Sequence, residues 1–167
     1  MRDWHRMPIC KSRPFDALQL MPTHAERKIV PYSREQLFDL VADVGSYPQF
    51  LPWCVAARVK SRSDTLLVAD LTIGFGPFRE CFSSRVTLDR PNRVTVTYEN
   101  GPFRYLNNQW DFSPHGSGAD VAFFVDFEFR SRILQAAIGV VFNEAVRRMV
   151  NAFLKRARDV YGPPPIA

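Results

Sequence analysis

Thiol and imidazole side chains are the groups in this sequence best suited to covalent or metal chemistry, and their spacing supports neither. Cys10, Cys54 and Cys81 form no CxxC pair, and nothing near Cys54 suggests a base or a cation that would activate its thiol. The histidines, at positions 5, 24 and 115, never fall at metal-ligand spacing. Widely separated cysteines in odd number are typical of buried thiols in a reducing compartment. We therefore expect no metal site and no disulfide framework.

Motifs of the common catalytic and nucleotide-binding classes are missing. The chain contains no GxxxxGK[ST], GxGxxG or GxSxG pattern. No acid–base pair or nucleophile arrangement emerges from the sequence. The prediction is a protein that is not an enzyme, with no catalytic residue and no catalytic cofactor.

Three polar residues, Glu80, Ser84 and Asn108, fall on strand faces that are otherwise apolar. Buried polar groups need partners, so each is either satisfied inside the protein or available to a ligand. The side chains of Ser84 and Asn108 can donate to a ligand carbonyl, and both readings stay open for them. Glu80 lies near a turn, where we expect it to be exposed rather than catalytic.

Positive charge is concentrated near the C-terminus. The net charge of the 167 residues is +5, and residues 130–161 alone hold seven basic side chains against two acidic ones. A basic stripe of this kind suits acidic lipid headgroups and nucleic acid phosphates equally well.

The chain is expected to form one domain without a membrane-spanning helix. Its longest uncharged helical run, 133–143, is shorter than the ~20 residues that a spanning helix needs, and the run 44–57 contains two prolines. We interpret residues 1–21 as a disordered or non-native extension, 22–162 as the domain and 163–167 as a tail.

Periodicity predicts the elements that position these side chains. A first strand, His24–Val30, precedes a helix that begins with a capping box of Ser33 and Gln36 and ends at Gly45, and a short helix follows over Ser46–Leu51. Alternating segments between turn residues then predict six antiparallel strands. They are Trp53–Arg62, Thr65–Phe75, Phe78–Leu88, Arg93–Glu99, Phe103–Phe112 and Asp120–Phe129.

A long helix closes the chain, with Ser131 as its N-cap and a stop after Tyr161. Its ~45 Å exceed the width of a small domain, so it must bend, with Gly139 as the expected point, or overhang. The predicted fold class is α+β with a helix-grip arrangement. In it, a curved antiparallel sheet of about seven strands wraps around the long C-terminal helix, with two short helices after the first strand.

The segment Asp43–Cys54, which reads DVGSYPQFLPWC, carries a family resemblance. With the predicted element order, residues 22–161 resemble the START-like superfamily and, within it, the coenzyme Q-binding protein family, which also contains bacterial ribosome-association toxins. The resemblance implies that ubiquinone or a similar isoprenoid lipid is held between helix and sheet. It also implies support of respiratory electron transport without a chemical step.

The residues expected to line this cavity come from three parts of the chain. The YPxFLPW segment contributes Tyr47, Phe50, Leu51, Pro52 and Trp53. The strands contribute Leu71, Ile73, Phe75, Phe82, Ser84, Val86, Asn108, Trp110, Phe127 and Phe129. The long helix contributes Ile133, Ala137, Ile138 and Val141. A solid core is the alternative for the apolar side chains, and a rigid corner rather than a gate is the alternative for the YPxFLPW segment.

The stretch 133–142 of the long helix is apolar almost all round, so its outer side is expected to face a membrane, a partner or a second copy. Two turns with the sequence Gly-Pro-Phe-Arg, at 76–79 and 101–104, suit a membrane interface or are a coincidence. We favour peripheral membrane contact and expect a cytoplasmic protein that reaches the inner membrane, or the matrix side in a eukaryote. The oligomeric state stays open.

Two other functions compete with the carrier. An interaction protein would bind the large ribosomal subunit through the basic C-terminal helix, although the basic residues are dispersed and no stacking aromatics lie among them. A small enzyme is the third, because aromatic polyketide cyclases belong to the wider superfamily.

Overall fold

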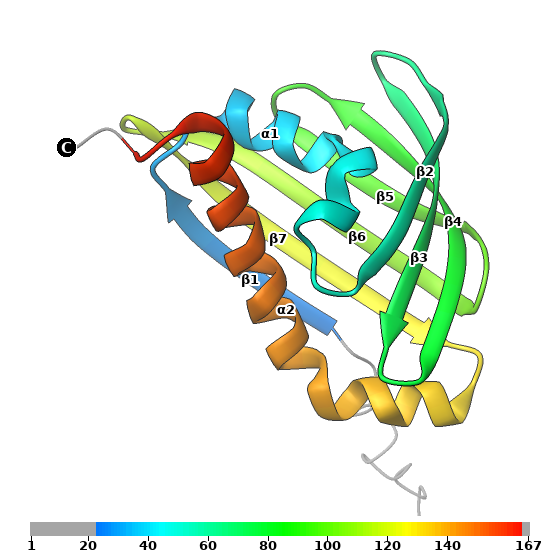
Figure 1. Cartoon of the computed structure of the whole chain (residues 1–167). Helices are drawn as coiled ribbons and strands as arrows, with labels where there is room; N and C mark the ends of the chain where they lie inside the picture. The colour runs from blue at the N-terminus through cyan, green and yellow to red at the C-terminus, as the bar shows by residue number, and fades with distance from the viewer. Residues whose placement is uncertain (1–22, 165–167) are drawn as a thin grey trace, which may run out of the picture.

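The computed structural model describes residues 23–164 and contains one seven-stranded antiparallel sheet that curves around a long C-terminal helix (Figure 1). The strand order is β1-β7-β6-β5-β4-β3-β2. The strands are β1 (Thr23–Val30), β2 (Cys54–Arg62), β3 (Leu66–Phe75), β4 (Phe78–Asp89), β5 (Arg93–Asn100), β6 (Phe103–His115) and β7 (Gly118–Phe129). The helices are α1 (Arg34–Ala42), the 3-10 helix η2 (Val44–Gln49) and α2 (Arg132–Tyr161). The predicted helix-grip fold is confirmed.

The limits of the predicted domain lie partly outside the described residues. The predicted extension, residues 1–21, falls there, as do residues 165–167 of the predicted tail. None of the helices within residues 23–164 is long and apolar enough to cross a membrane.

The sheet follows from strands whose side chains alternate between an apolar and a polar face. In β7 every second residue from Ala119 to Phe129 is buried, and the residues between them are half-buried or exposed. Antiparallel pairing of β3 to β7, with register shifts between Ser83 and Ser84 and between Phe103 and Tyr105, brings the apolar faces together on the concave side. The concave face therefore forms one continuous apolar surface opposite the helices.

Helix α1 begins at the predicted capping box. The Ser33 hydroxyl accepts from the Gln36 amide at 3.2 Å, and the Gln36 side-chain oxygen accepts from the Ser33 amide at 3.0 Å. The helix ends at Ala42, earlier than the predicted Gly45, because Val44 already starts η2. The short helix predicted over Ser46–Leu51 is this 3-10 helix, shifted toward the N-terminus.

Helix α2 is 30 residues long, and its N-cap is Ser131, whose hydroxyl accepts from the Leu134 amide at 3.3 Å. Its C-cap is Gly162, whose φ of 82° is one that glycine adopts without strain. Figure 1 shows that α2 bends in its N-terminal half, where the colour passes from yellow to orange. The predicted bend is thus present, and it allows one helix to turn across one end of the sheet and then run along its concave face.

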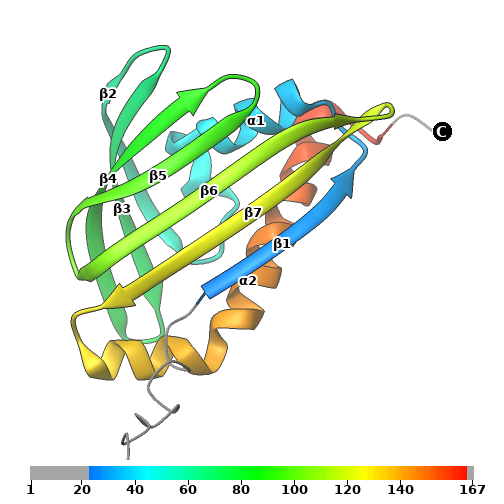
Figure 2. The same cartoon turned by 180° about the vertical axis from the view of Figure 1, so that it is seen from behind.

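The end of the sheet where α2 begins also carries two turns. The β3–β4 turn, the β5–β6 turn and the β7–α2 connection all lie there (Figures 1 and 2). Both Gly-Pro-Phe-Arg sequences therefore lie at this end. Phe103 is only 4% exposed and Phe78 packs against the core, so neither phenylalanine projects from the surface.

Candidate functional site

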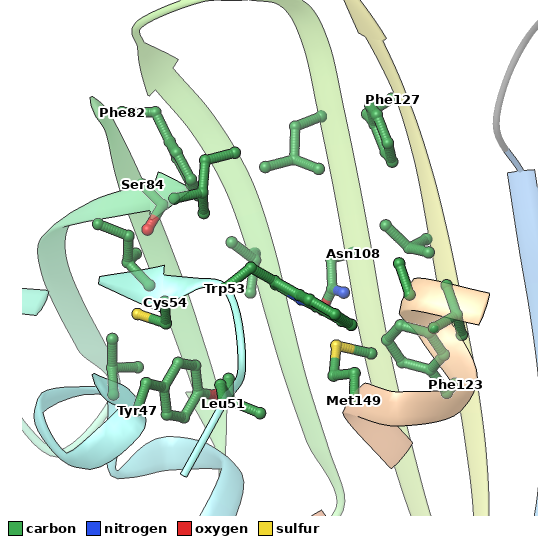
Figure 3. A pocket seen from close by; sticks show the side chains of 18 of the residues that line it. Tyr47, Leu51, Trp53, Cys54, Phe82, Ser84, Asn108, Phe123, Phe127 and Met149 are labelled. Atoms are coloured by element: carbon green, nitrogen blue, oxygen red, sulfur yellow. The ribbon is translucent and has the colours of Figure 1, made fainter. Parts of the chain in front are cut away.

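A cavity of about 270 Å³ lies between the concave face of the sheet, η2 and α2 (Figure 3). Each of the strands β2 to β7 contributes inward side chains to its wall, and α2 closes it from the other side. Nearly all of the wall is apolar. A mostly apolar wall with a few polar groups is typical of pockets that hold small apolar ligands.

On the central strands β4 and β6, the polar side chains of Ser84 and Asn108 interrupt the apolar wall. The amide of Asn108, in the middle of β6 between Val96 of β5 and Val125 of β7, forms no hydrogen bond with any residue that the structure describes, and its Oδ1 is fully buried. Ser84 is completely buried, and its hydroxyl reaches the carbonyl oxygen of Ala69 at 3.5 Å, the limit of a hydrogen bond. Asn108 therefore holds an unused donor and an unused acceptor inside the cavity wall.

Two ionisable side chains in the wall near η2, Tyr47 and Cys54, are neutral at pH 7, and burial moves their pKa values still further from neutrality. Burial raises the pKa of the Cys54 thiol to about 11 and raises that of the Tyr47 hydroxyl further above its usual range. The Tyr47 hydroxyl donates to the carbonyl oxygen of Val41 at 2.6 Å. The Cys54 thiol lies 3.6 Å from the carbonyl oxygen of Ala56. At neutral pH this part of the wall carries no charge.

Aromatic contacts fix η2 against α2. The Phe153 ring lies 5.6 Å from the Tyr47 ring and 5.2 Å from the Phe50 ring, and the Arg156 guanidinium covers Phe50 at 5.4 Å. Trp53 follows this corner, and its carbonyl oxygen accepts from the Gly74 amide at 2.9 Å. Figure 3 shows the Trp53 ring extending over Asn108 toward Met149.

Most of the predicted lining residues lie in the wall. They are Tyr47, Leu51, Trp53, Leu71, Ile73, Phe75, Phe82, Ser84, Val86, Asn108, Trp110, Phe127, Phe129 and Ile138. The strand residues are all placed correctly because alternation determines which of them face inward.

Five predicted lining residues do not line the cavity. Phe50 packs against Phe153 and Arg156 behind the wall, and Pro52 is exposed. On α2, Ile133 is 74% exposed, and neither Ala137 nor Val141 reaches the wall. The error on α2 is one of rotation, because a helical stretch that is apolar on every side does not show which side faces the sheet.

The prediction also missed part of the wall. Most of the missed residues continue the inward faces already assigned to the strands and helices, and Cys54 belongs to the YPxFLPWC segment itself. They are Val41, Val44, Cys54, Val94, Val96, Phe103, Leu106, Phe123, Val125, Phe142, Ala145, Val146, Met149 and Phe153. The spacing of the last five along α2 follows the helical period and was a usable signal for the buried side.

Residues 30–154 match the model of the family described as polyketide cyclase / dehydrase and lipid transport. The chain belongs to this family. A member from Rickettsia prowazekii named "Ribosome association toxin RatA" is 42% identical over 137 residues, which cover 80% of this chain and 94% of that protein. The Xenopus laevis "Coenzyme Q-binding protein COQ10 homolog B, mitochondrial" is 36% identical over 144 residues, 83% of this chain and 59% of that protein.

Solved structures agree with the family assignment. The 18 kDa protein CC1736 from Caulobacter crescentus superposes with a TM-score of 0.69 at 34% identity, covering 84% of this chain and 99% of that one. The Zhui aromatase/cyclase from Streptomyces sp. R1128 superposes with a TM-score of 0.72 at 17% identity, covering 84% and 96%. The second likeness concerns the fold alone.

Proposed function

We propose that this protein binds ubiquinone or a similar isoprenoid lipid in the helix–sheet cavity without converting it, and thereby supports respiratory electron transport. The observation that carries the proposal is an apolar cavity with an unpartnered amide, Asn108, in its wall. A relative of the family has a name that states coenzyme Q binding.

The chemistry of the Asn108 amide suits a quinone head. Its NH₂ group can donate to a quinone carbonyl, and its Oδ1 can accept from the hydroxyl of the reduced quinol, so one side chain serves both redox forms. A ligand that forms either bond also removes the cost of a buried polar atom without a partner, about 1–3 kcal/mol.

The size of the cavity limits how much of such a lipid is enclosed. A volume of about 270 Å³ lies just below the range of about 300–1,000 Å³ that is typical of small-ligand pockets. It suits a ring and the first units of a tail, whose burial contributes about 0.8 kcal/mol per CH₂ group. The remainder of a long polyprenyl tail must then lie outside the cavity.

The direct test is mass spectrometry of lipid extracted from freshly purified protein. An isoprenoid quinone at near-stoichiometric amount, reduced in the Asn108→Leu variant, is the expected result. Failure to recover any isoprenoid lipid, combined with failure of purified protein to take up added ubiquinone from micelles, would contradict the proposal.

Association with the ribosome is the second candidate, since several relatives in the family have names that state it, including one that is 42% identical. Its test is co-sedimentation of the purified protein with ribosomes. The expected result for this function is retention by ribosomes that an Arg132→Glu or Arg158→Glu change weakens, while a cavity variant such as Asn108→Leu leaves it unchanged.

A further inference from the structure

The N-terminal third of α2 exposes aliphatic side chains that no other described element covers. Val140 is 87% exposed and Ile133 is 74% exposed, the two largest values among the exposed large hydrophobic residues of the described chain. Ala136 lies between them on the same helical face and is also exposed. A Cβ atom placed on Gly139 would meet nothing within 4 Å. We call Ile133, Ala136, Gly139 and Val140 the outer apolar face.

The opposite side of the same turns belongs to the cavity. Ile138 and Phe142 line it, and Leu134 is buried beneath the helix. This part of α2 therefore separates the apolar cavity from the outside with apolar side chains on both of its faces. Between Arg132 and Asn143 it contains no acidic residue.

The charges at this end of the sheet are mostly those of arginines. The two turns and the β7–α2 connection hold Arg79, Arg104, Arg130 and Arg132 against Glu80 and Glu128. Arg104 pairs with Glu128 at 3.4 Å, whereas the other three arginines form no ion pair with any described residue. Three unpaired arginines and one unpaired carboxylate, that of Glu80, therefore remain in these connections among the described residues. The net charge beside the outer apolar face is positive.

This combination identifies the kind of partner. A stable interface with a second copy of the chain would bury ~800 Å² on each side. The outer apolar face is only two helical turns, or about 10 Å, long and is too small for such an interface. RNA would use the arginines but has no use for exposed aliphatic side chains, and single-stranded RNA requires stacking aromatics that this face lacks. An anionic bilayer matches both features, since aliphatic side chains enter the acyl boundary while arginines meet the phosphates.

We propose that the outer apolar face and the neighbouring arginines dock on the surface of an anionic bilayer, and that the cavity receives its lipid from this side. The docking stands on the exposed residues alone, and the loading step rests on the proposed lipid-binding function. The part of a lipid tail that does not fit the cavity then stays in the bilayer, next to α2, which separates the bilayer from the cavity.

The experiment is co-sedimentation with vesicles of phosphatidylcholine alone and of phosphatidylcholine with phosphatidylglycerol. The full chain is compared with Ile133→Glu/Val140→Glu and with Arg132→Glu. Val160→Glu and Arg158→Glu are matched controls, because both residues are exposed at the other end of the same helix. We expect binding that requires phosphatidylglycerol, a loss of about ten-fold or more in the first two variants, and little change in the controls.

Two further measurements separate the possible failures. Uptake of a short-chain ubiquinone from detergent micelles should be unchanged in Ile133→Glu/Val140→Glu, while uptake from vesicles should fall with docking. Equal vesicle binding by all variants, or ribosome binding that depends on Ile133 and Val140 without vesicle binding, would overturn the docking surface. Docking without uptake from micelles would instead refute the proposed lipid binding and leave the docking surface standing.

Discussion

At the scale of single residues, Asn108 holds an amide inside an apolar wall where no described residue bonds to it. A buried polar atom without a partner lowers stability, and a bond to a ligand restores the loss. Asn108 thus lowers the stability of the ligand-free protein and raises its affinity for a ligand that bonds to the amide. A buried polar residue without a partner is expected in the wall of a site that is complementary to a ligand.

Replacing Asn108 by leucine should therefore separate stability from binding. The free energy of unfolding of the ligand-free protein should rise by about 1 kcal/mol, and affinity for a short-chain ubiquinone should fall about ten-fold. Denaturant unfolding and a quinone titration measure the two quantities. Asn107→Leu is the matched control, because Asn107 is the adjacent residue on the opposite, exposed face. A variant that loses stability and keeps its affinity would assign Asn108 a structural role.

Cys54 offers a second prediction, about reactivity. Burial raises the pKa of its thiol from the ordinary value of 9.0 to about 11. The folded state then holds about 100-fold less thiolate at neutral pH than the unfolded state, and the thiolate is the reactive form. Alkylation of Cys54 should be at least about 100-fold slower in the folded protein than in denaturant, and its folded rate should rise about ten-fold per pH unit up to about pH 11.

Peptide mass spectrometry after timed alkylation measures this rate. The exposed Cys81 is the internal control and should be labelled readily in both states. Labelling of Cys54 in the folded protein as fast as that of Cys81 would contradict the burial of its thiol in the cavity wall.

At the scale of elements, the strands were predictable and the long helix only in part. Alternation in β3, β4, β6 and β7 assigns each side chain to one of two faces, so Leu71, Phe82, Asn108 and Phe127 were placed correctly. A helix needs a rotation angle as well, and a stretch without polar residues supplies none. That is why Ile133 was predicted to face the cavity although it is exposed.

The irregular segment between α1 and β2 shows a second limit. Its specific motif marked the right place, since Tyr47, Leu51, Trp53 and Cys54 line the cavity. Side chains in a 3-10 helix and a turn follow no long period, so the packing of Phe50 against Phe153 needed coordinates.

Gly139 provides a prediction about α2. Glycine within a helix costs about 0.5–1 kcal/mol relative to alanine, and a Cβ at this position would meet nothing within 4 Å. Gly139→Ala should therefore raise the free energy of unfolding by that amount, and Ala136→Gly, one turn earlier on the same exposed face, should lower it by a similar amount. Thermal and denaturant unfolding measure both. A loss of stability in Gly139→Ala would show that the bend of α2 depends on this glycine.

At the scale of the whole molecule, the two candidate functions would use different surfaces. Lipid binding would use the apolar cavity, and ribosome association would use charged residues on the exterior. The cavity between helix and sheet is lined by no charged side chain, whereas any contact with RNA must use surface arginines and lysines. On α2 several of these are already paired: Arg147 and Arg148 with Glu144 at 3.0 and 2.8 Å, and Lys155 with Asp159 at 2.8 Å. The positive charge left for phosphates is therefore smaller than the sequence count indicates.

Salt dependence follows from this division and distinguishes the functions. Ribosome association through α2 and the connection before it would use the side chains without a carboxylate partner among the described residues, Arg130, Arg132, Arg156 and Arg158. With about four phosphate contacts, the slope of log K against log salt should be about −3 to −3.6, which is a loss of roughly 50- to 150-fold between 50 and 200 mM salt. Quinone binding should change less than about two-fold, because no charge is screened in an uncharged cavity. Sedimentation and quinone titration at matched salt concentrations measure both slopes. A steep salt dependence of quinone binding would show that charged groups take part in it and would refute the apolar site. A salt dependence of ribosome binding much steeper than this slope would place the RNA contact on surfaces other than α2.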